Sequence, residues 1–131
     1  MKKVYFDNAA TTNLRKEVVH TMVNVLKTEY GNPSSTHSYG RSSKSLLESC
    51  RKEISKLFSV DASEIIFTSG GTEADNLVLN SSVQDLGVQR IITSKIEHHA
   101  VLHTVEKLQQ KFNIEVAYVD LNKKGQVNLS H

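Results

Sequence analysis

The stretch Phe67-Thr68-Ser69-Gly70-Gly71-Thr72-Glu73-Ala74-Asp75-Asn76 decides the fold. A short apolar run at residues 65–68 leads into the two glycines, and a helical pattern follows over residues 73–83. A buried strand that enters a helix through a tight glycine turn is typical of parallel sheets with crossover helices. The stretch therefore predicts an α/β fold.

The same alternation of strand and helix continues downstream. The pattern predicts a strand over residues 90–93, a helix over residues 98–112 and a strand over residues 115–119. Together with residues 65–68, these strands would form a three-stranded parallel sheet. Such a sheet is incomplete for a doubly wound domain and leaves an open edge, so we expect a piece of a larger fold or a partner in an assembly.

Two longer helices are expected upstream of this alternation. Apolar residues at helical spacing predict them over residues 14–30 and 39–58. Between them, Gly31 is expected to cap the first helix and Pro33 to prevent its continuation. A short strand-like start at residues 4–6 precedes the first helix.

Composition narrows the class of protein. Charged residues make up 23% of the chain and hydrophobic residues 38%, as in soluble globular proteins. The net charge of +2 is small, so neither nucleic acid nor a membrane is expected as a partner, and no secretory leader is recognised. The single cysteine, Cys50, excludes an internal disulfide network and favours a cytoplasmic setting. Its place on the apolar stripe of the second helix predicts a buried structural side chain.

The glycine turn also predicts an anion site. Gly70 and Gly71 permit positive φ and close backbone approach, while Thr72 adds a hydroxyl. The first amides of the following helix lack intrahelical partners and lie at the positive end of the helix dipole. These features suit a phosphate, although a tight turn without a ligand explains the glycines equally well.

A histidine follows the second predicted strand. Ligands of open parallel sheets bind beyond the carboxyl ends of the strands, so His98 and Thr72 are expected to face the same ligand. The imidazole could stack on a planar ring or transfer protons, and the alternative is an exposed histidine that caps a helix. His99 and His103 have the spacing of a metal-binding pair, but a solvated helix face is expected and no metal site is predicted.

Taken in order, the motifs of this chain resemble the cysteine desulfurase branch of the class V aminotransferase family. They are the stretch at residues 67–76 and the segments Tyr5-Phe6-Asp7-Asn8-Ala9-Ala10-Thr11-Thr12, Gly31-Asn32-Pro33-Ser34-Ser35-Thr36-His37 and Glu97-His98-His99-Ala100-Val101-Leu102. The resemblance covers essentially the whole chain. It implies an N-terminal arm at residues 1–13, with the N-terminal part of an aspartate-aminotransferase-like large domain at residues 14–131. The implied architecture is a partial three-layer sandwich with a mostly parallel sheet, preceded by the arm and two helices.

The resemblance also implies an activity. Such an enzyme uses pyridoxal 5'-phosphate to remove sulfur from L-cysteine, and it yields alanine and an enzyme persulfide for iron–sulfur cluster or thio-cofactor synthesis. Gly71 and Thr72 would hold the cofactor phosphate, while His98 would stack on the ring and assist proton transfers. Residues 7–12 and 32–37 would wall the substrate side. A homodimer and an iron–sulfur scaffold or other sulfur-acceptor protein are the implied partners.

The family is considerably longer than these 131 residues. Its Schiff-base lysine, the aspartate that faces the pyridine nitrogen, the arginine for the substrate carboxylate and the nucleophilic cysteine all belong to regions beyond His131. Residues 1–131 alone are therefore expected to be inactive, and Cys50 does not match the nucleophile. Two other interpretations stay open: a non-catalytic interaction module that retains the phosphate loop, and a selenocysteine lyase or another enzyme of the family.

Overall fold

The computed structural model describes residues 3–129. The chain consists of two compact units, Met1–Ile66 and Phe67–His131. Residues 1–2 of the predicted arm and residues 130–131 of the predicted cofactor-binding domain lie outside the described range. Among the described residues, no helix has both the length and the apolar character needed to cross a membrane.

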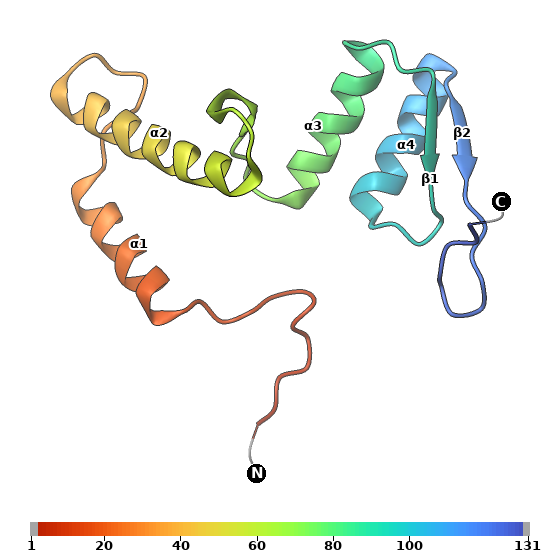
Figure 1. Cartoon of the computed structure of the whole chain (residues 1–131), viewed down its shortest axis with the longest axis horizontal. Coiled ribbons are helices and arrows are strands. Elements are labelled where there is room, and N and C mark those ends of the chain that lie inside the picture. The colour runs from red at the N-terminus through yellow and green to blue at the C-terminus, as the bar shows by residue number, and fades with distance from the viewer. Residues whose placement is uncertain (1–2, 130–131) are drawn as a thin grey trace. The chain divides into compact units, whose positions relative to one another are not determined.

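The first unit contains two helices and a short 3-10 turn (Figure 1). They are α1 (Lys16–Thr28), α2 (Ser38–Phe58) and η1 (Ala62–Glu64). Both predicted helices are present, with ends close to those expected. Gly31 is not the cap of α1, because the helix ends earlier and the backbone N–H of Glu29 closes it on the carbonyl oxygen of Val25 at 2.8 Å.

Two glycines in this unit allow a close approach of backbone segments. A Cβ on Gly31 would collide with the backbone of Tyr39, and a Cβ on Gly40 would collide with the carbonyl oxygen of Asn32. The loop before α2 is therefore folded tightly onto the start of that helix. There the N–H of Gly40 donates to Nδ1 of His37 at 3.3 Å, which caps α2.

The apolar stripe of α2 is exposed over most of its length. Leu57 is 83% exposed, and Cys50 is also exposed. The buried positions of this helix are its small residues, Gly40, Ser43 and Ser55. Leu46 and Ile54 on the same stripe are partly buried, but Cys50 is not, so the prediction of a buried Cys50 is wrong.

The second unit forms an α/β arrangement. It contains α3 (Gly71–Gln84), β1 (Arg90–Thr93), α4 (His99–Phe112) and β2 (Glu115–Tyr118). The two strands pair in parallel, in a register that runs from Arg90 opposite Glu115 to Thr93 opposite Tyr118, and α4 is the crossover helix. The predicted α/β class and the parallel strand–helix–strand unit are confirmed.

The predicted third strand is absent from the sheet. Among residues 3–129 the sheet contains β1 and β2 alone, and residues 65–68 lie outside it, as do residues 4–6. Ile65 does have extended backbone, with φ −92° and ψ 117°, but Ile66 is 67% exposed. An extended backbone at Ile65 is not enough to make the apolar run a strand, since a strand also requires a hydrogen-bonded neighbour.

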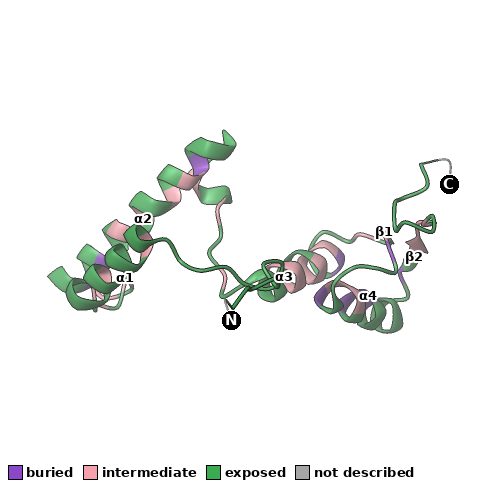
Figure 2. Cartoon of the chain, turned by 90° about the horizontal axis from the view of Figure 1, so that it is seen from below, coloured by how far each residue is buried: buried purple, intermediate pink, exposed green. Residues whose placement is uncertain are grey.

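The core lies between the helices and one face of the sheet. Figure 2 shows buried segments on α3, on α4 and next to the strands, whereas α1 has no buried residue. The cluster contains Val83, Leu108 and Ile114, and the partly buried side chains packed against it are Leu79, Ile91 and Val116. Full burial of a side chain of this size contributes about 1.5–3 kcal/mol, so this cluster holds α3 beside α4. Ile92, on the opposite face of β1, is 66% exposed, so within this unit α3 and α4 cover one face of the sheet.

Candidate functional site

A pocket of about 320 Å³ lies between the first half of α3 and α4. Thr72 and His98, the two side chains that the sequence predicts to face one ligand, both line it. The structure therefore brings together a residue in the first turn of α3 and the residue that precedes α4, which β1 separates in the sequence. The pocket is lined by Thr72, Asn76, His98, His99, Ala100, His103, Thr104 and Lys107.

The first backbone amides of α3 are not capped. Gly70 precedes the helix with extended backbone (φ 167°), and no side chain caps the first turn. The first intrahelical hydrogen bond runs from the Ala74 N–H to the Gly70 carbonyl oxygen at 3.1 Å, so the preceding amides of Gly71 and Thr72 have no helical acceptor. These amides lie at the positive end of the helix dipole, where an anion is favoured.

The glycines of this turn leave room rather than supply an unusual conformation. Neither Gly70 nor Gly71 lies in the left-handed region that favours glycine, so that part of the prediction is wrong. The residue before this helix has an extended backbone, and any residue type can adopt an extended backbone. A Cβ on either glycine would meet no atom within 4 Å, so the space beside the helix start is available to a ligand.

The acidic residue in the first turn of α3 is held by the loop that precedes it. Oε2 of Glu73 accepts hydrogen bonds from the hydroxyl and the backbone N–H of Ser69, each at 2.6 Å. Both hydrogen bonds lower the pKa of Glu73 below its ordinary value, and the bond from the hydroxyl has the larger effect. Because this carboxylate is bound to Ser69, it does not compete with a phosphate for the amides of Gly71 and Thr72.

His98 is the residue that precedes α4. Its Nδ1 accepts a hydrogen bond from the N–H of Ala100 at 3.1 Å, so the ring is fixed at the helix start. The loop before it is held by a hydrogen bond from the Ser94 hydroxyl to Oε1 of Glu97 at 3.1 Å. Because Nδ1 is an acceptor, the neutral ring carries its proton on Nε2, and Nε2 is the nitrogen that can exchange a proton with a ligand. The helix-capping alternative and a ligand-facing role are thus compatible.

Sequence reasoning did not identify Asn76 and Thr104 as pocket residues. The Thr104 hydroxyl donates to Oδ1 of Asn76 at 2.6 Å, and Nδ2 of Asn76 donates to the carbonyl oxygen of Thr72 at 2.7 Å. Thr104 lies one helical turn after Ala100, on the helix that follows His98. This spacing is the sequence signal that could have identified Thr104 as a pocket residue.

The neighbouring histidines also border the pocket. The ring centroids of His99 and His103 are 5.2 Å apart, with an interplanar angle of 31°. Within the described part of the chain, no group of at least three His, Cys, Asp or Glu side chains is arranged to hold a metal ion. The pair is thus a polar wall of the pocket on the exposed side of α4.

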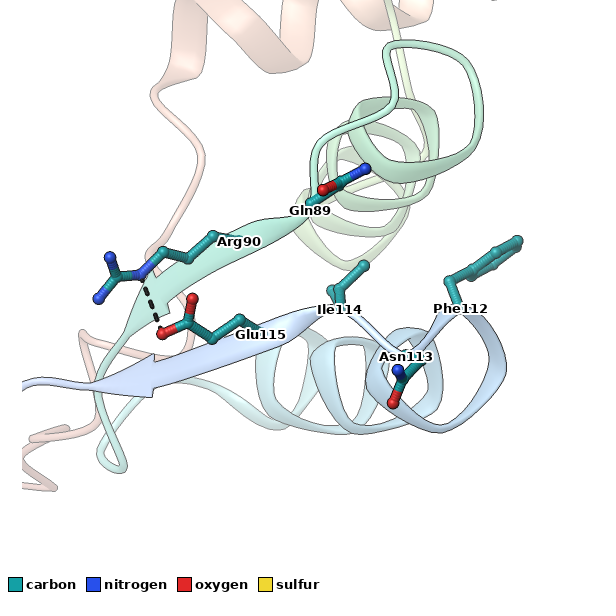
Figure 3. Close-up of a pocket in the computed structure, with 6 residues that line it drawn as sticks. All are labelled: Gln89, Arg90, Phe112, Asn113, Ile114 and Glu115. Carbon is teal, nitrogen blue, oxygen red and sulfur yellow. Dashed lines mark ion pairs between the residues drawn. The ribbon is translucent and has the colours of Figure 1, made fainter.

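A larger hollow, of about 590 Å³, lies at the opposite ends of the strands (Figure 3). Arg90 and Glu115 are two of its lining residues; Nε of Arg90 and Oε1 of Glu115 lie 3.3 Å apart, and both side chains are more than half exposed. An ion pair exposed to this degree contributes little to stability. Ligands of parallel sheets bind at the carboxyl ends of the strands, and this hollow lies at their amino ends, so the pocket at Thr72 and His98 is the better candidate.

Comparison with known proteins identifies the chain's relatives. Residues 4–131 match the family described as Aminotransferase class-V. The chain is 44% identical to the putative cysteine desulfurase IscS 1 of Bacillus subtilis (strain 168), over 98% of this chain and 34% of that protein. It is 43% identical to the cysteine desulfurase IscS of Dictyoglomus turgidum (strain DSM 6724 / Z-1310), over 97% of this chain and 32% of that protein.

Solved structures resemble it over nearly the same range. A NifS-like protein has a TM-score of 0.90 and 37% identity, over 98% of this chain and 36% of the other. A structure described as SspA in complex with cysteine has a TM-score of 0.81 and 30% identity, over 90% of this chain and 34% of the other. The chain spans about a third of the length of the curated relatives it matches (34% and 32%). It belongs to the class-V aminotransferase family.

Proposed function

We propose that these residues form part of a pyridoxal-phosphate-dependent cysteine desulfurase, which removes sulfur from L-cysteine and leaves alanine. The observation that carries the proposal is the single pocket shared by Thr72 and His98. A pocket that combines the open start of α3 with an imidazole suits a phosphorylated ring cofactor, and this supports the proposal. The names of the curated relatives and the similar structure in complex with cysteine support cysteine as the substrate.

The residues of the pocket fit the phosphate end of this cofactor. The amides of Gly71 and Thr72 are free of helical acceptors, and the space beside Gly70 and Gly71 is open. Within residues 3–129, the hydroxyl of Thr72 has no hydrogen-bond partner, so it can donate to a phosphate oxygen without losing an internal contact. The carboxylate of Glu73 is already held by Ser69.

The side chains would divide the work between binding and proton transfer. When bound, the cofactor supplies an electron sink for bond cleavage at the substrate, and the protein supplies position and electrostatics. Gly71 and Thr72 would anchor the phosphate through N–H and O–H donors. His98 would cover the ring and exchange a proton at Nε2, since its Nδ1 is held by Ala100. The sulfur would pass to an enzyme cysteine as a persulfide; Cys50 is not assigned this role.

We also propose a homodimer that delivers its sulfur to an iron–sulfur scaffold or another acceptor protein in the cytoplasm. The exposed apolar side chains of α1 and α2 support a further covering surface, which the rest of the protein or a second copy would provide. Leu26 and Leu57 are examples of such side chains.

The test uses the full-length protein with L-cysteine and pyridoxal phosphate. We expect alanine, measured by chromatography, and a persulfide, measured by thiol labelling, with both dependent on the cofactor. Residues 1–131 produced alone serve as the control and should release no alanine. Absence of alanine from the full-length protein would contradict the proposal, and turnover of L-selenocysteine alone would identify a selenocysteine lyase instead.

A further inference from the structure

A hydrogen-bonded pair connects the two helices that border the candidate site. The Thr104 hydroxyl on α4 donates to Oδ1 of Asn76 on α3 at 2.6 Å. Thr104 is 6% exposed and Asn76 is half-buried, so water competes little for this bond. The bond joins positions 28 residues apart in the sequence and lies at the wall of the pocket.

The carbonyl of Thr72 determines which way the Asn76 amide points. Nδ2 of Asn76 donates to that carbonyl oxygen at 2.7 Å, and this leaves Oδ1 directed at Thr104. A flipped amide would place Oδ1 against the Thr72 carbonyl oxygen, where both atoms are acceptors. The order of donors and acceptors from Thr104 through Asn76 to Thr72 is therefore fixed.

This chain of hydrogen bonds ends at one anchor of the candidate site, Thr72, and at a residue close to the group that holds the other anchor, His98. Thr72 is the residue whose amide and hydroxyl would hold the phosphate. Thr104 lies one helical turn from Ala100, whose N–H holds the ring of His98. A change in the distance between α3 and α4 at this level would therefore change the spacing between the phosphate anchor and the imidazole.

We propose that Asn76 and Thr104 are positioning residues, which set the spacing between the phosphate-binding start of α3 and His98 at the start of α4. The inference rests on the proposed function, because it assumes a ligand that touches both anchors. A ligand that touches only the start of α3 does not depend on that spacing. This difference separates positioning from a general contribution to stability.

The test uses the full-length protein, from which the cofactor is removed and to which it is returned. The variants are Asn76→Leu, the nearly isosteric Thr104→Val, and Thr104→Ser, which keeps the hydroxyl. Asn80→Leu is the matched control: Asn80 is also on α3 and makes the same type of bond, from its Nδ2 to the Asn76 carbonyl oxygen at 2.7 Å, but it does not line the pocket. Affinity for pyridoxal phosphate is measured by absorbance titration. Affinity for inorganic phosphate is measured by its competition with pyridoxal phosphate in the same titration.

We expect Thr104→Val to weaken pyridoxal phosphate binding about three- to tenfold, the loss that follows from one neutral hydrogen bond. Asn76→Leu removes that bond and the bond to the Thr72 carbonyl oxygen, so its loss should be at least as large. Affinity for inorganic phosphate should stay at the wild-type value in both variants. Thr104→Ser should restore cofactor affinity, and Asn80→Leu should match the wild type. Thr104→Val alone suffices if Asn76→Leu does not fold.

Equal losses for both ligands, no loss for either, or the same loss in Asn80→Leu would overturn the inference. If the wild type binds the cofactor and Thr104→Val binds it equally well, the positioning role fails while the proposed function stands. If the wild type binds no pyridoxal phosphate, both fail. Spacing-dependent cofactor binding without alanine formation from L-cysteine would support the pair and contradict the proposed substrate.

Discussion

Replacing Thr72 with valine in the full-length protein isolates the contribution of one hydroxyl to cofactor binding. Valine keeps the branched shape of threonine and has a similar helix propensity. Thr72 is exposed at the pocket wall, and its hydroxyl has no partner among residues 3–129, so the substitution removes no side-chain hydrogen bond of the described chain. Its effect should therefore fall on the ligand.

The size of the effect follows from the charge of the phosphate. A hydrogen bond to a charged group contributes about 1.5–3 kcal/mol. Because Thr72 is exposed, water competes for both partners, and the lower part of that range applies. A loss of about 1.5–2 kcal/mol corresponds to roughly 10- to 30-fold weaker binding.

The assay compares two ligands on the cofactor-free protein. Absorbance titration gives the affinity for pyridoxal phosphate and for pyridoxal, which lacks the phosphate. Thr72→Val should weaken only the first, and Thr72→Ser, which keeps the hydroxyl, should stay near the wild type. Unchanged affinity for pyridoxal phosphate, or an equal loss for both ligands, would refute the assignment of this hydroxyl to the phosphate.

Further predictions concern the ring, the acidic residue of the helix start and the cysteine. His98→Ala should lower the rate of alanine formation about 100-fold or more, because that is the contribution of a general acid–base group. The variant should keep most of its cofactor. Loss of the cofactor, with normal turnover by the protein that still holds it, would be inconsistent with a role of His98 in proton transfer. The hydrogen bonds from Ser69 lower the pKa of Glu73, so the ionised Glu73 carboxylate stabilises the folded state. This contribution is fully present above the ordinary pKa of 4.5 and is lost as the pH falls through the lowered pKa. The difference in melting temperature between the wild type and Glu73→Gln should accordingly be largest above pH 4.5 and vanish in stronger acid; a difference that grows on acidification would reverse the sign. Cys50→Ser should leave the alanine yield and the persulfide signal unchanged, whereas loss of the persulfide would make Cys50 the sulfur carrier.

Local pattern was enough to predict the unit from β1 through α4 to β2. Apolar spacing marks each element, and short connections leave the parallel pairing of the two strands as the simple solution. The meeting of Thr72 and His98 in one pocket followed from the rule that ligands of parallel sheets bind at the carboxyl ends of strands.

The errors concern properties that depend on distant parts of the structure. The apolar run at residues 65–68 predicted a strand, but a strand also needs a hydrogen-bonded neighbour. Cys50 lies on an apolar stripe, yet its burial depends on a covering element that local spacing does not specify. The bond between Thr104 and Asn76 spans 28 residues, and neither position carries a local signal of its partner.

The central claim is that the start of α3 and His98 hold pyridoxal phosphate between them. A crystal structure of the full-length protein with the cofactor tests it most directly. We predict the phosphate within hydrogen-bond distance of the Gly71 and Thr72 amides and the Thr72 hydroxyl, with the ring against His98. A cofactor bound elsewhere, for example in the hollow between Arg90 and Glu115, or a phosphate that makes no contact with α3, would contradict the account.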